Sequence, residues 1–115
     1  MTVTEAAEKI EGTIVAGPST SSREIQGAYV SDLLSDVMAN SREGDLWVTL
    51  QKHVNIVAVA QLNGLAGIVL VNGRKPDPDT VARAEELGIP IVSSPLQAFD
   101  IAGTLYTLGI RRRTV

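Results

Sequence analysis

Three polar side chains, Gln51, His53 and Asn55, occupy alternate positions at the start of an otherwise apolar segment. His53 is the only histidine of the chain, and it could act as a general acid or base if a nucleophile or carboxylate lay beside it. Asp32 is a carboxylate that could approach His53 across adjacent strand ends. The same polar segment could equally contact a small ligand or a protein partner, and the residues alone leave these alternatives open.

The sequence lacks the residues that several other kinds of site require. The chain has no cysteine, so it has no disulfide, thiolate metal site or thiol nucleophile, and one histidine makes a poor transition-metal site. Neither phosphate-binding glycine motif, G-x-x-x-x-G-K-[ST] or G-x-G-x-x-G, is present. We therefore expect a protein that is not an enzyme and has no catalytic residue, metal or cofactor. A small phosphotransferase that uses His53 or Asp32 is the less favoured alternative.

Apolar strand-like runs alternate with amphipathic helical runs, which is typical of a parallel α/β sheet. The sequence predicts an α/β domain with Rossmann-like three-layer architecture, a mostly parallel sheet and flanking helices. The expected strands cover residues 12–16, 25–30, 46–50, 66–71 and 89–92. Helices are expected at 4–10, after Ser31, at 53–62, after Asp77 and after Ser94.

Ligands of parallel sheets bind beyond the carboxyl ends of the strands, where neighbouring helices begin. Polar residues fall at those predicted ends, and the pair Asn72-Gly73 follows the strand predicted at 66–71. The tentative ligand-binding residues are Ser31, Asp32, Thr49, Gln51, His53, Asn55, Gly73, Ser93 and Ser94. Helix capping alone is the competing explanation for Ser31 and Ser94, because α/β proteins need such residues at these turns.

Helix signals give more detailed expectations. Ser31 is expected to cap its helix, and Ser94 to Gln97 has the spacing of a capping box. Asp77-Pro78 is the clearest helix start, and Gly88 suits the end of that helix. The expected apolar stripes are Leu33, Leu34, Val37 and Met38 in one helix, and Phe99, Ala102, Leu105 and Tyr106 in the last.

The segment 53–62 is rich in β-branched residues, which favour a strand. A helix is predicted nevertheless, because parallel strands on either side need a crossover between them. A helix that is apolar on nearly all sides must be buried in the core or against a second subunit. Residues 54–62 are therefore the expected surface of a homodimer, whereas Trp47 is expected in the core.

The length, composition and net charge of the chain limit the classes of partner that it could bind. A chain of 115 residues suits one domain, here residues 1–115. Aromatic residues make up 3% and the net charge is −3, which argues against nucleic acid and anionic membranes as partners. The amino terminus lacks a signal-peptide pattern and no apolar run could span a bilayer, so we expect a cytoplasmic protein. The Arg111–Arg113 run could bind an acidic partner or simply be solvated.

Residues 27–38 (GAYVSDLLSDVM) and 47–60 (WVTLQKHVNIVAVA), together with Gly73 and residues 86–91 (ELGIPI), resemble DRTGG-domain proteins. His53-Val54-Asn55 stands near the Asp-Arg-Thr position that names the family, and Gly73 matches one of its paired glycines. The resemblance implies a Rossmann-like unit similar to the N-terminal domain of HPr kinase/phosphorylase, which tends to dimerise. Such domains accompany CBS nucleotide-sensing domains or sit within larger enzymes, and no catalytic residues carry over.

The expected function is therefore a non-catalytic regulatory module that forms a homodimer and senses a small ligand such as a nucleotide. The alternative is an adaptor that binds a regulatory protein partner. The resemblance places stand-alone members near genes for iron-only hydrogenases and anti-sigma-type kinases, which fits either function.

Overall fold

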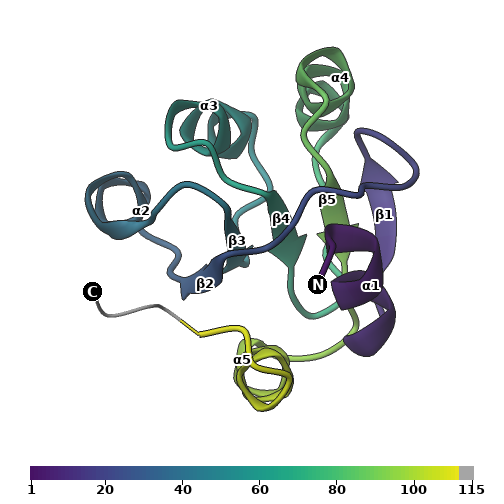
Figure 1. The fold of residues 1–115 in the computed structure, drawn as a ribbon. Coiled ribbons are helices and arrows are strands. Elements are labelled where there is room, and N and C mark those ends of the chain that lie inside the picture. The colour runs from purple at the N-terminus through teal and green to yellow at the C-terminus, as the bar shows by residue number, and fades with distance from the viewer. Residues whose placement is uncertain (112–115) are drawn as a thin grey trace.

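The computed structural model describes residues 1–111, in which a five-stranded sheet lies between two layers of helices (Figure 1). The strands are β1 (Thr13–Ala16), β2 (Gly27–Val30), β3 (Asp45–Thr49), β4 (Gly67–Leu70) and β5 (Ile91–Ser93). The helices are α1 (Val3–Lys9), α2 (Leu34–Asn40), α3 (Asn55–Leu62), α4 (Pro78–Leu87) and α5 (Ala98–Thr107).

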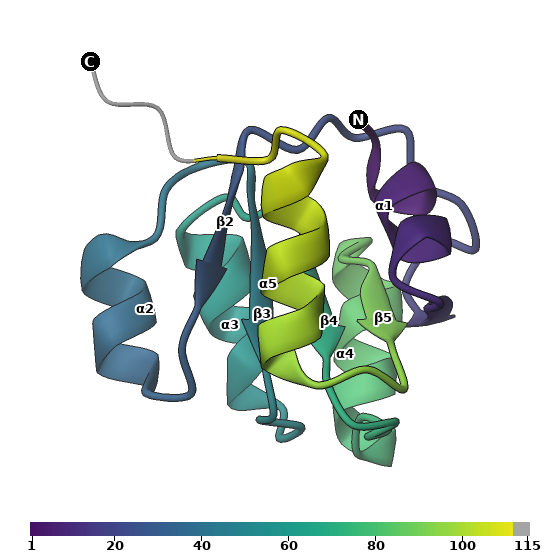
Figure 2. The ribbon, with the colours of Figure 1, turned by 90° about the horizontal axis from the view of Figure 1, so that it is seen from below.

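The sheet has the order β1-β5-β4-β3-β2. Strands β2 to β5 run parallel, and β1 joins the end of the sheet antiparallel to β5. Helices α2, α3 and α4 connect the parallel strands across one face, whereas α1 and α5 cover the other (Figures 1 and 2). The predicted α/β, three-layer, mostly parallel architecture is confirmed.

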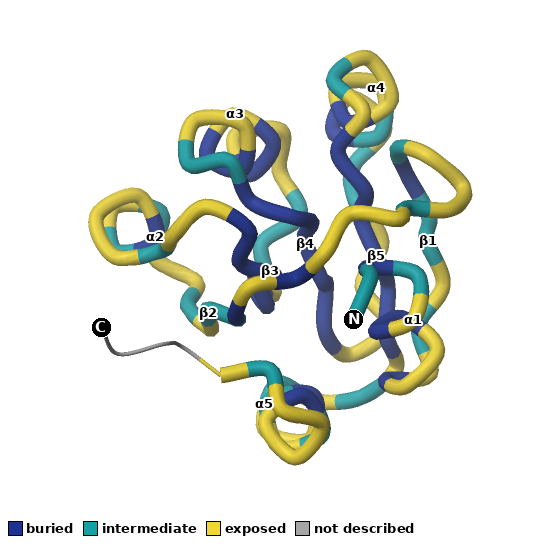
Figure 3. The backbone as a smooth tube through the Cα atoms, viewed as in Figure 1, coloured by how far each residue is buried: buried dark blue, intermediate teal, exposed yellow. Residues whose placement is uncertain are grey.

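Two apolar clusters fill the spaces between the layers, and the alternation of β3 divides its side chains between them. Leu46 and Val48 pack with α1 and α5, whereas Trp47 packs with α2, α3 and α4. All three are buried, and Figure 3 shows the same burial along the central strands. The prediction that Trp47 belongs to the core is confirmed.

The segment after β3 is helical, as the need for a crossover predicted, despite its β-branched residues. Ile56, Val57, Val59 and Ala60 are buried in the core, so the domain itself covers most of this apolar helix. Leu62 remains 69% exposed at its end. Burial against a second subunit is therefore not needed to explain the composition of α3, and a homodimer surface at residues 54–62 stays a prediction.

Helix α2 begins later than expected, and the prediction that Ser31 caps it is wrong. The N-cap is Leu33, without a side-chain hydrogen bond, and Ser31 Oγ accepts a bond from the Leu33 amide at 3.2 Å. The indole Nε1 of Trp47 donates to Ser31 O at 2.8 Å, which holds this residue beside β3. Of the expected stripe, Val37 is buried, whereas Leu33 and Met38 are exposed.

The expected capping box at Ser94 is also wrong, because α5 begins at Ala98 with Gln97 as its N-cap. Ser94 is fully buried, and its Oγ donates to Ile10 O at 2.7 Å. It therefore ties the end of β5 to the end of α1 instead of starting a helix.

The buried face of α5 is formed by Ile101 and Leu105. Phe99 and Tyr106, expected in the apolar stripe, are 85% and 59% exposed. The expected stripe is thus wrong at these two positions, because the helix turns them away from the sheet. Arg111 lies at the end of the described chain, and the rest of the expected Arg111–Arg113 run lies outside the described residues.

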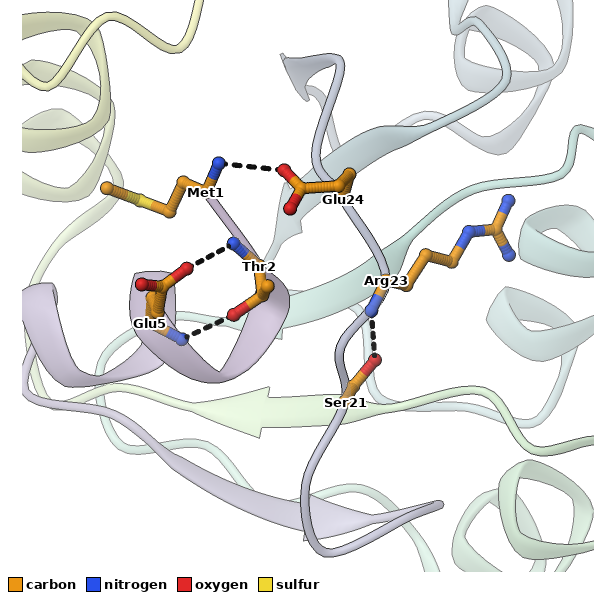
Figure 4. Close-up of polar contacts among 6 residues, drawn as sticks. All are labelled: Met1, Thr2, Glu5, Ser21, Arg23 and Glu24. Carbon is orange, nitrogen blue, oxygen red and sulfur yellow. Dashed lines mark hydrogen bonds and ion pairs between the residues drawn. The ribbon is translucent and has the colours of Figure 1, made fainter.

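The ends of α4 follow their sequence signals. Asp77 is the N-cap, Pro78 is the first helical residue, and Gly88 ends the helix in a left-handed conformation at φ +69°. At α1, a capping box between Thr2 and Glu5 was not predicted; Thr2 Oγ1 accepts from the Glu5 amide at 3.2 Å (Figure 4). Among residues 1–111, no helix has the length and apolar character needed to cross a membrane.

Candidate functional site

A hollow of about 360 Å³ opens where β2, β3 and β4 end and α5 begins. It is the edge of the sheet at which parallel α/β domains bind their ligands. We call it the carboxyl-edge hollow, and its lining residues are Val30, Asp32, Val48, Thr49, Leu50, Val71, Asn72, Gln97, Ala98 and Phe99. Two of the predicted site residues, Asp32 and Thr49, therefore lie in one hollow.

Asp32 and Thr49 are joined by hydrogen bonds at the ends of β2 and β3. Asp32 Oδ1 accepts from Thr49 Oγ1 at 2.9 Å and from the Leu50 amide at 2.8 Å. Gln51 adds two bonds, because its amide donates to Thr49 Oγ1 at 3.1 Å and its Nε2 donates to Asp32 O at 3.1 Å. Three predicted site residues thus form one network, which fixes the Asp32 carboxylate at the rim of the hollow.

The first turn of α5 forms the opposite wall of the hollow. Its first intrahelical bond runs from the Ile101 amide to Gln97 O, and Gln97 makes no side-chain cap. The amides that precede Ile101 in the helix are therefore available to an acceptor, and they lie at the positive end of the helix dipole. Phe99 lines the same wall and is almost fully exposed.

The turn after β4 supports the hollow from behind. Asn72 has a left-handed conformation at φ 58°, and its amide donates to Leu96 O at 2.9 Å. The Gly73 amide donates to Ser94 O at 2.7 Å, and Ser93 Oγ donates to Arg74 O at 2.7 Å. Gly73, Ser93 and Ser94 therefore hold this turn against the segment after β5, and the structure places them outside the lining of the hollow.

His53 lies apart from Asp32. Its Nδ1 is 2.7 Å from Asp77 Oδ2, at the start of α4, and Lys52 Nζ is 3.5 Å from Asp77 Oδ1. Asn55 is exposed as the first residue of α3. The predicted approach of Asp32 to His53 is therefore not found, and His53 and Asn55 do not line the carboxyl-edge hollow.

The hydrogen bond from His53 lowers the pKa of Asp77 below the usual aspartate range, and the Lys52 charge adds to this effect. A carboxylate with a depressed pKa stabilises the fold above its unfolded pKa, and this contribution is lost as pH falls through the folded value. We expect His53→Ala, which removes the donor, to raise the Asp77 pKa and to weaken the dependence of stability on pH in the acid range. Carboxyl-carbon NMR titration measures the first effect, and urea unfolding across acid pH measures the second.

Lys52→Ala serves as the comparison, because it removes the charge and the hydrogen bond of Lys52, each a smaller cause than the hydrogen bond from His53. It should raise the Asp77 pKa less than His53→Ala does. Equal pKa values for Asp77 in the wild type and in His53→Ala would contradict the role of the histidine hydrogen bond.

A family model decides the relationship of this chain: the model of the DRTGG domain matches residues 5–108. The chain belongs to the DRTGG domain family. No protein of curated description matches it in sequence.

A solved structure shares the fold of this DRTGG domain. It contains the CBS and DRTGG domains of the regulatory region of Clostridium perfringens pyrophosphatase, complexed with an activator, diadenosine tetraphosphate. The match has a TM-score of 0.64 at 12% identity over 97% of the present chain. It covers 50% of the other chain, so the present chain spans about half of that regulatory region.

In this DRTGG domain, the residues at the positions for which the family is named lie in two separate places. His53 and Asn55 lie at the start of α3, whereas Gly73 follows β4 in a turn with positive φ. His53 reaches Asp77 of α4 and not the turn of Gly73. The carboxyl-edge hollow lies elsewhere, between the ends of β2 to β4 and the first turn of α5. Gln97 and Phe99 line it but were not among the predicted site residues.

A second hollow, of about 470 Å³, lies at the opposite edge of the sheet in this DRTGG domain. Arg23 extends from the loop of Ser21 (Figure 4), and its Nη2 donates to Gly64 O at 2.6 Å, just after α3. Gly88, which ends α4, also lines this hollow. Because the carbonyl ends of two helices meet here and Arg23 already binds one of them, we favour the smaller hollow as the ligand site.

Proposed function

We propose that this DRTGG domain is a non-catalytic regulatory module that binds a nucleotide in the carboxyl-edge hollow. The main observation behind this proposal is that one hollow brings together the fixed carboxylate of Asp32, the exposed ring of Phe99 and the first turn of α5. Each of these groups suits a different part of a nucleotide.

The three parts of the ligand have distinct partners. Amides at a helix N-terminus favour a phosphate group, so the α5 turn is the proposed phosphate position. Carboxylates at strand ends accept hydrogen bonds from ribose hydroxyls, which assigns that contact to Asp32. An aromatic ring stacks on a base whatever its identity, so Phe99 is the proposed base platform.

The similarity to the pyrophosphatase regulatory region supports this proposal at the level of the fold. That region was solved with a dinucleotide activator, diadenosine tetraphosphate. Because the present chain matches half of that chain, a nucleotide ligand is here a proposal, which rests on the residues of the hollow.

The non-catalytic part of the proposal rests on how the two candidate acid–base groups are engaged. His53 Nδ1 pairs with Asp77, and no serine or threonine hydroxyl of residues 1–111 hydrogen-bonds to the imidazole. Asp32 Oδ1 is occupied by Thr49 and Leu50. Within the same residues, no three His, Cys, Asp or Glu side chains gather at a potential metal position.

The test is a titration with adenine and guanine nucleotides, measured by calorimetry and by the melting temperature. A ligand at about 100 times its dissociation constant stabilises the native state by about 2.7 kcal/mol, which raises the melting temperature by several degrees. Phe99→Ala should weaken binding about tenfold, since a stacked base contributes about 1–3 kcal/mol. Phe99 is almost fully exposed, so the fold should be unaffected.

Leu62→Ala is the matched control, because Leu62 is also largely exposed but lies on α3, away from the hollow. It should bind the nucleotide like the wild type. If Phe99→Ala binds the nucleotide as tightly as the wild type does, the nucleotide binds outside the carboxyl-edge hollow. Absence of any nucleotide effect would reject the sensor and favour the adaptor function.

A further inference from the structure

We propose that an apolar groove between α5 and β2 is a binding site for a short aliphatic carboxylate. This ligand and its site differ in chemistry from a nucleotide in the carboxyl-edge hollow, so the inference goes beyond the proposed function. The groove has a volume of about 190 Å³, and we call it the α5 groove. Its lining residues are Ala28, Val30, Val48, Ala102, Leu105, Tyr106, Ile110 and Arg111.

Small residues on two neighbouring elements leave this space open. Ala28 of β2 and Ala102 of α5 both line the groove and are only partly buried. Val48 and Leu105 line it as well and belong to the core, whereas Val30 is 50% exposed. The groove lies where α5 crosses the sheet beside β2 (Figure 2). An aliphatic ligand there would remove these apolar side chains from water, which favours binding.

The end of α5 forms part of the groove through a well-defined turn. Gly109 has φ +93°, which favours glycine, and its amide donates to Tyr106 O at 3.0 Å. The next amide, that of Ile110, donates to Leu105 O at 3.0 Å. These two bonds form a Schellman motif, in which the apolar side chain after the glycine packs back on the helix. Ile110 packs against the core in this way, and the turn places Arg111 beside it.

Arg111 provides a positive charge at the groove. Its guanidinium carbon lies 4.3 Å from the centre of the Tyr106 ring, and its Nε donates to Tyr106 O at 3.3 Å. Its two Nη groups form no hydrogen bond or ion pair within residues 1–111. Among the same residues, no Asp or Glu lines the groove. Because a guanidinium binds a carboxylate through parallel hydrogen bonds, this charge selects an anionic head group.

The volume of the groove limits the length of the aliphatic tail. A water molecule occupies about 30 Å³ in the liquid and a methylene group has a similar size, so 190 Å³ holds a tail of about six carbons. Pockets for larger organic ligands have volumes of about 300–1,000 Å³. The apolar lining, the single cation and the small volume therefore favour a short alkanoate over a nucleotide or a sugar.

The test is a titration of the ligand-free protein with straight-chain alkanoates from butanoate to decanoate, below the concentrations at which they form micelles. Calorimetry measures the affinity, and methyl NMR at Ala28 and Ala102 locates the ligand. Each added methylene group should strengthen binding about fourfold until the groove is filled, and longer chains should gain nothing further. Hexanol, which lacks the carboxylate, should bind several-fold more weakly than hexanoate.

Four variants separate the groove from the rest of α5. Ala102→Leu fills the groove and should abolish alkanoate binding. Thr107→Leu is the matched control, because it adds an apolar side chain at an exposed position of the same helix outside the groove, and it should bind hexanoate like the wild type. If Ala102→Leu fails to fold, Ala28→Val narrows the groove from β2. Arg111→Gln should reduce the affinity for hexanoate to that for hexanol.

A wild type that binds no alkanoate would overturn the inference, and sedimentation of the same sample would show whether a second copy covers the groove instead. Hexanoate binding that Ala102→Leu and Ala28→Val leave unchanged would also overturn it, as would equal affinities for hexanoate and hexanol. These titrations contain no nucleotide, so their failure leaves the proposed nucleotide function untouched. Failure of the nucleotide titration likewise leaves the alkanoate site standing.

Discussion

Replacement of Trp47 by alanine is expected to lower the free energy of unfolding by about 3–5 kcal/mol, the usual cost of removing a buried aromatic side chain. Trp47 is fully buried among α2, α3 and α4, and its Nε1 donates to Ser31 O at 2.8 Å. The substitution leaves a cavity and an unsatisfied carbonyl, and both effects destabilise the fold. Urea unfolding followed by circular dichroism measures the loss, since the variant has no tryptophan for fluorescence.

Trp47→Phe leaves a smaller cavity than Trp47→Ala, because it keeps one aromatic ring in the core, and it also removes the hydrogen bond to Ser31. It should cost clearly less than Trp47→Ala. Since Ser31 adjoins Asp32, either variant should also loosen the carboxyl-edge hollow, which amide hydrogen exchange at Leu50 would detect. A loss below about 1 kcal/mol for Trp47→Ala would contradict a tightly packed core at this position.

The sheet was predictable because its signals are local and repeated. The unbroken apolar run Leu46-Trp47-Val48 indicates a strand that is buried on both faces. Helix α3 is the opposite case: its β-branched residues indicate a strand, and only the need to connect β3 with β4 predicted a helix. Topology outweighed local propensity, as it often does for buried segments.

Helix starts were less predictable where a serine has a distant partner. Ser94 has the spacing of a capping residue, but its hydroxyl donates to Ile10 O, which is far away in the sequence. The carbonyl of Ser31 is likewise bound by Trp47 of the next strand. A local sequence pattern contains only neighbours along the chain. It therefore cannot show that a group far away in the sequence forms a hydrogen bond with the residue and replaces its capping role.

The same limit applies to the candidate site. Asp32, Thr49 and Gln51 were predictable because each follows a strand, and parallel strands end at one edge. Phe99 was predicted to lie on the apolar stripe of the last helix, because its spacing fits a helical period. The buried face of α5 is formed instead by Ile101 together with Leu105, which leaves Phe99 pointing outward. The partner of His53 depended on the placement of α4 beside the end of β3, which no local pattern contains.

The second large effect is expected at Gly17, where alanine should cost about 3 kcal/mol of unfolding free energy. Gly17 has φ +79°, which L side chains rarely adopt, and a Cβ at this position would overlap the backbone carbonyl of Ile89. A backbone group cannot rotate away as a flexible side chain can, so the chain before β5 would have to move. Thermal and urea unfolding of Gly17→Ala measure the loss.

Gly88→Ala is the control that isolates the clash from the backbone conformation. Gly88 has a similar φ of +69°, but no atom lies within 4 Å of the position of its Cβ. Its alanine variant should therefore cost about 1 kcal/mol, the conformational part alone. If the two variants lose equal stability, then the approach of Ile89 to Gly17 contributes nothing. If Gly17→Ala loses clearly more, the contact between the ends of β1 and α4 is a fixed part of the fold, and glycine is required there by space as well as by φ.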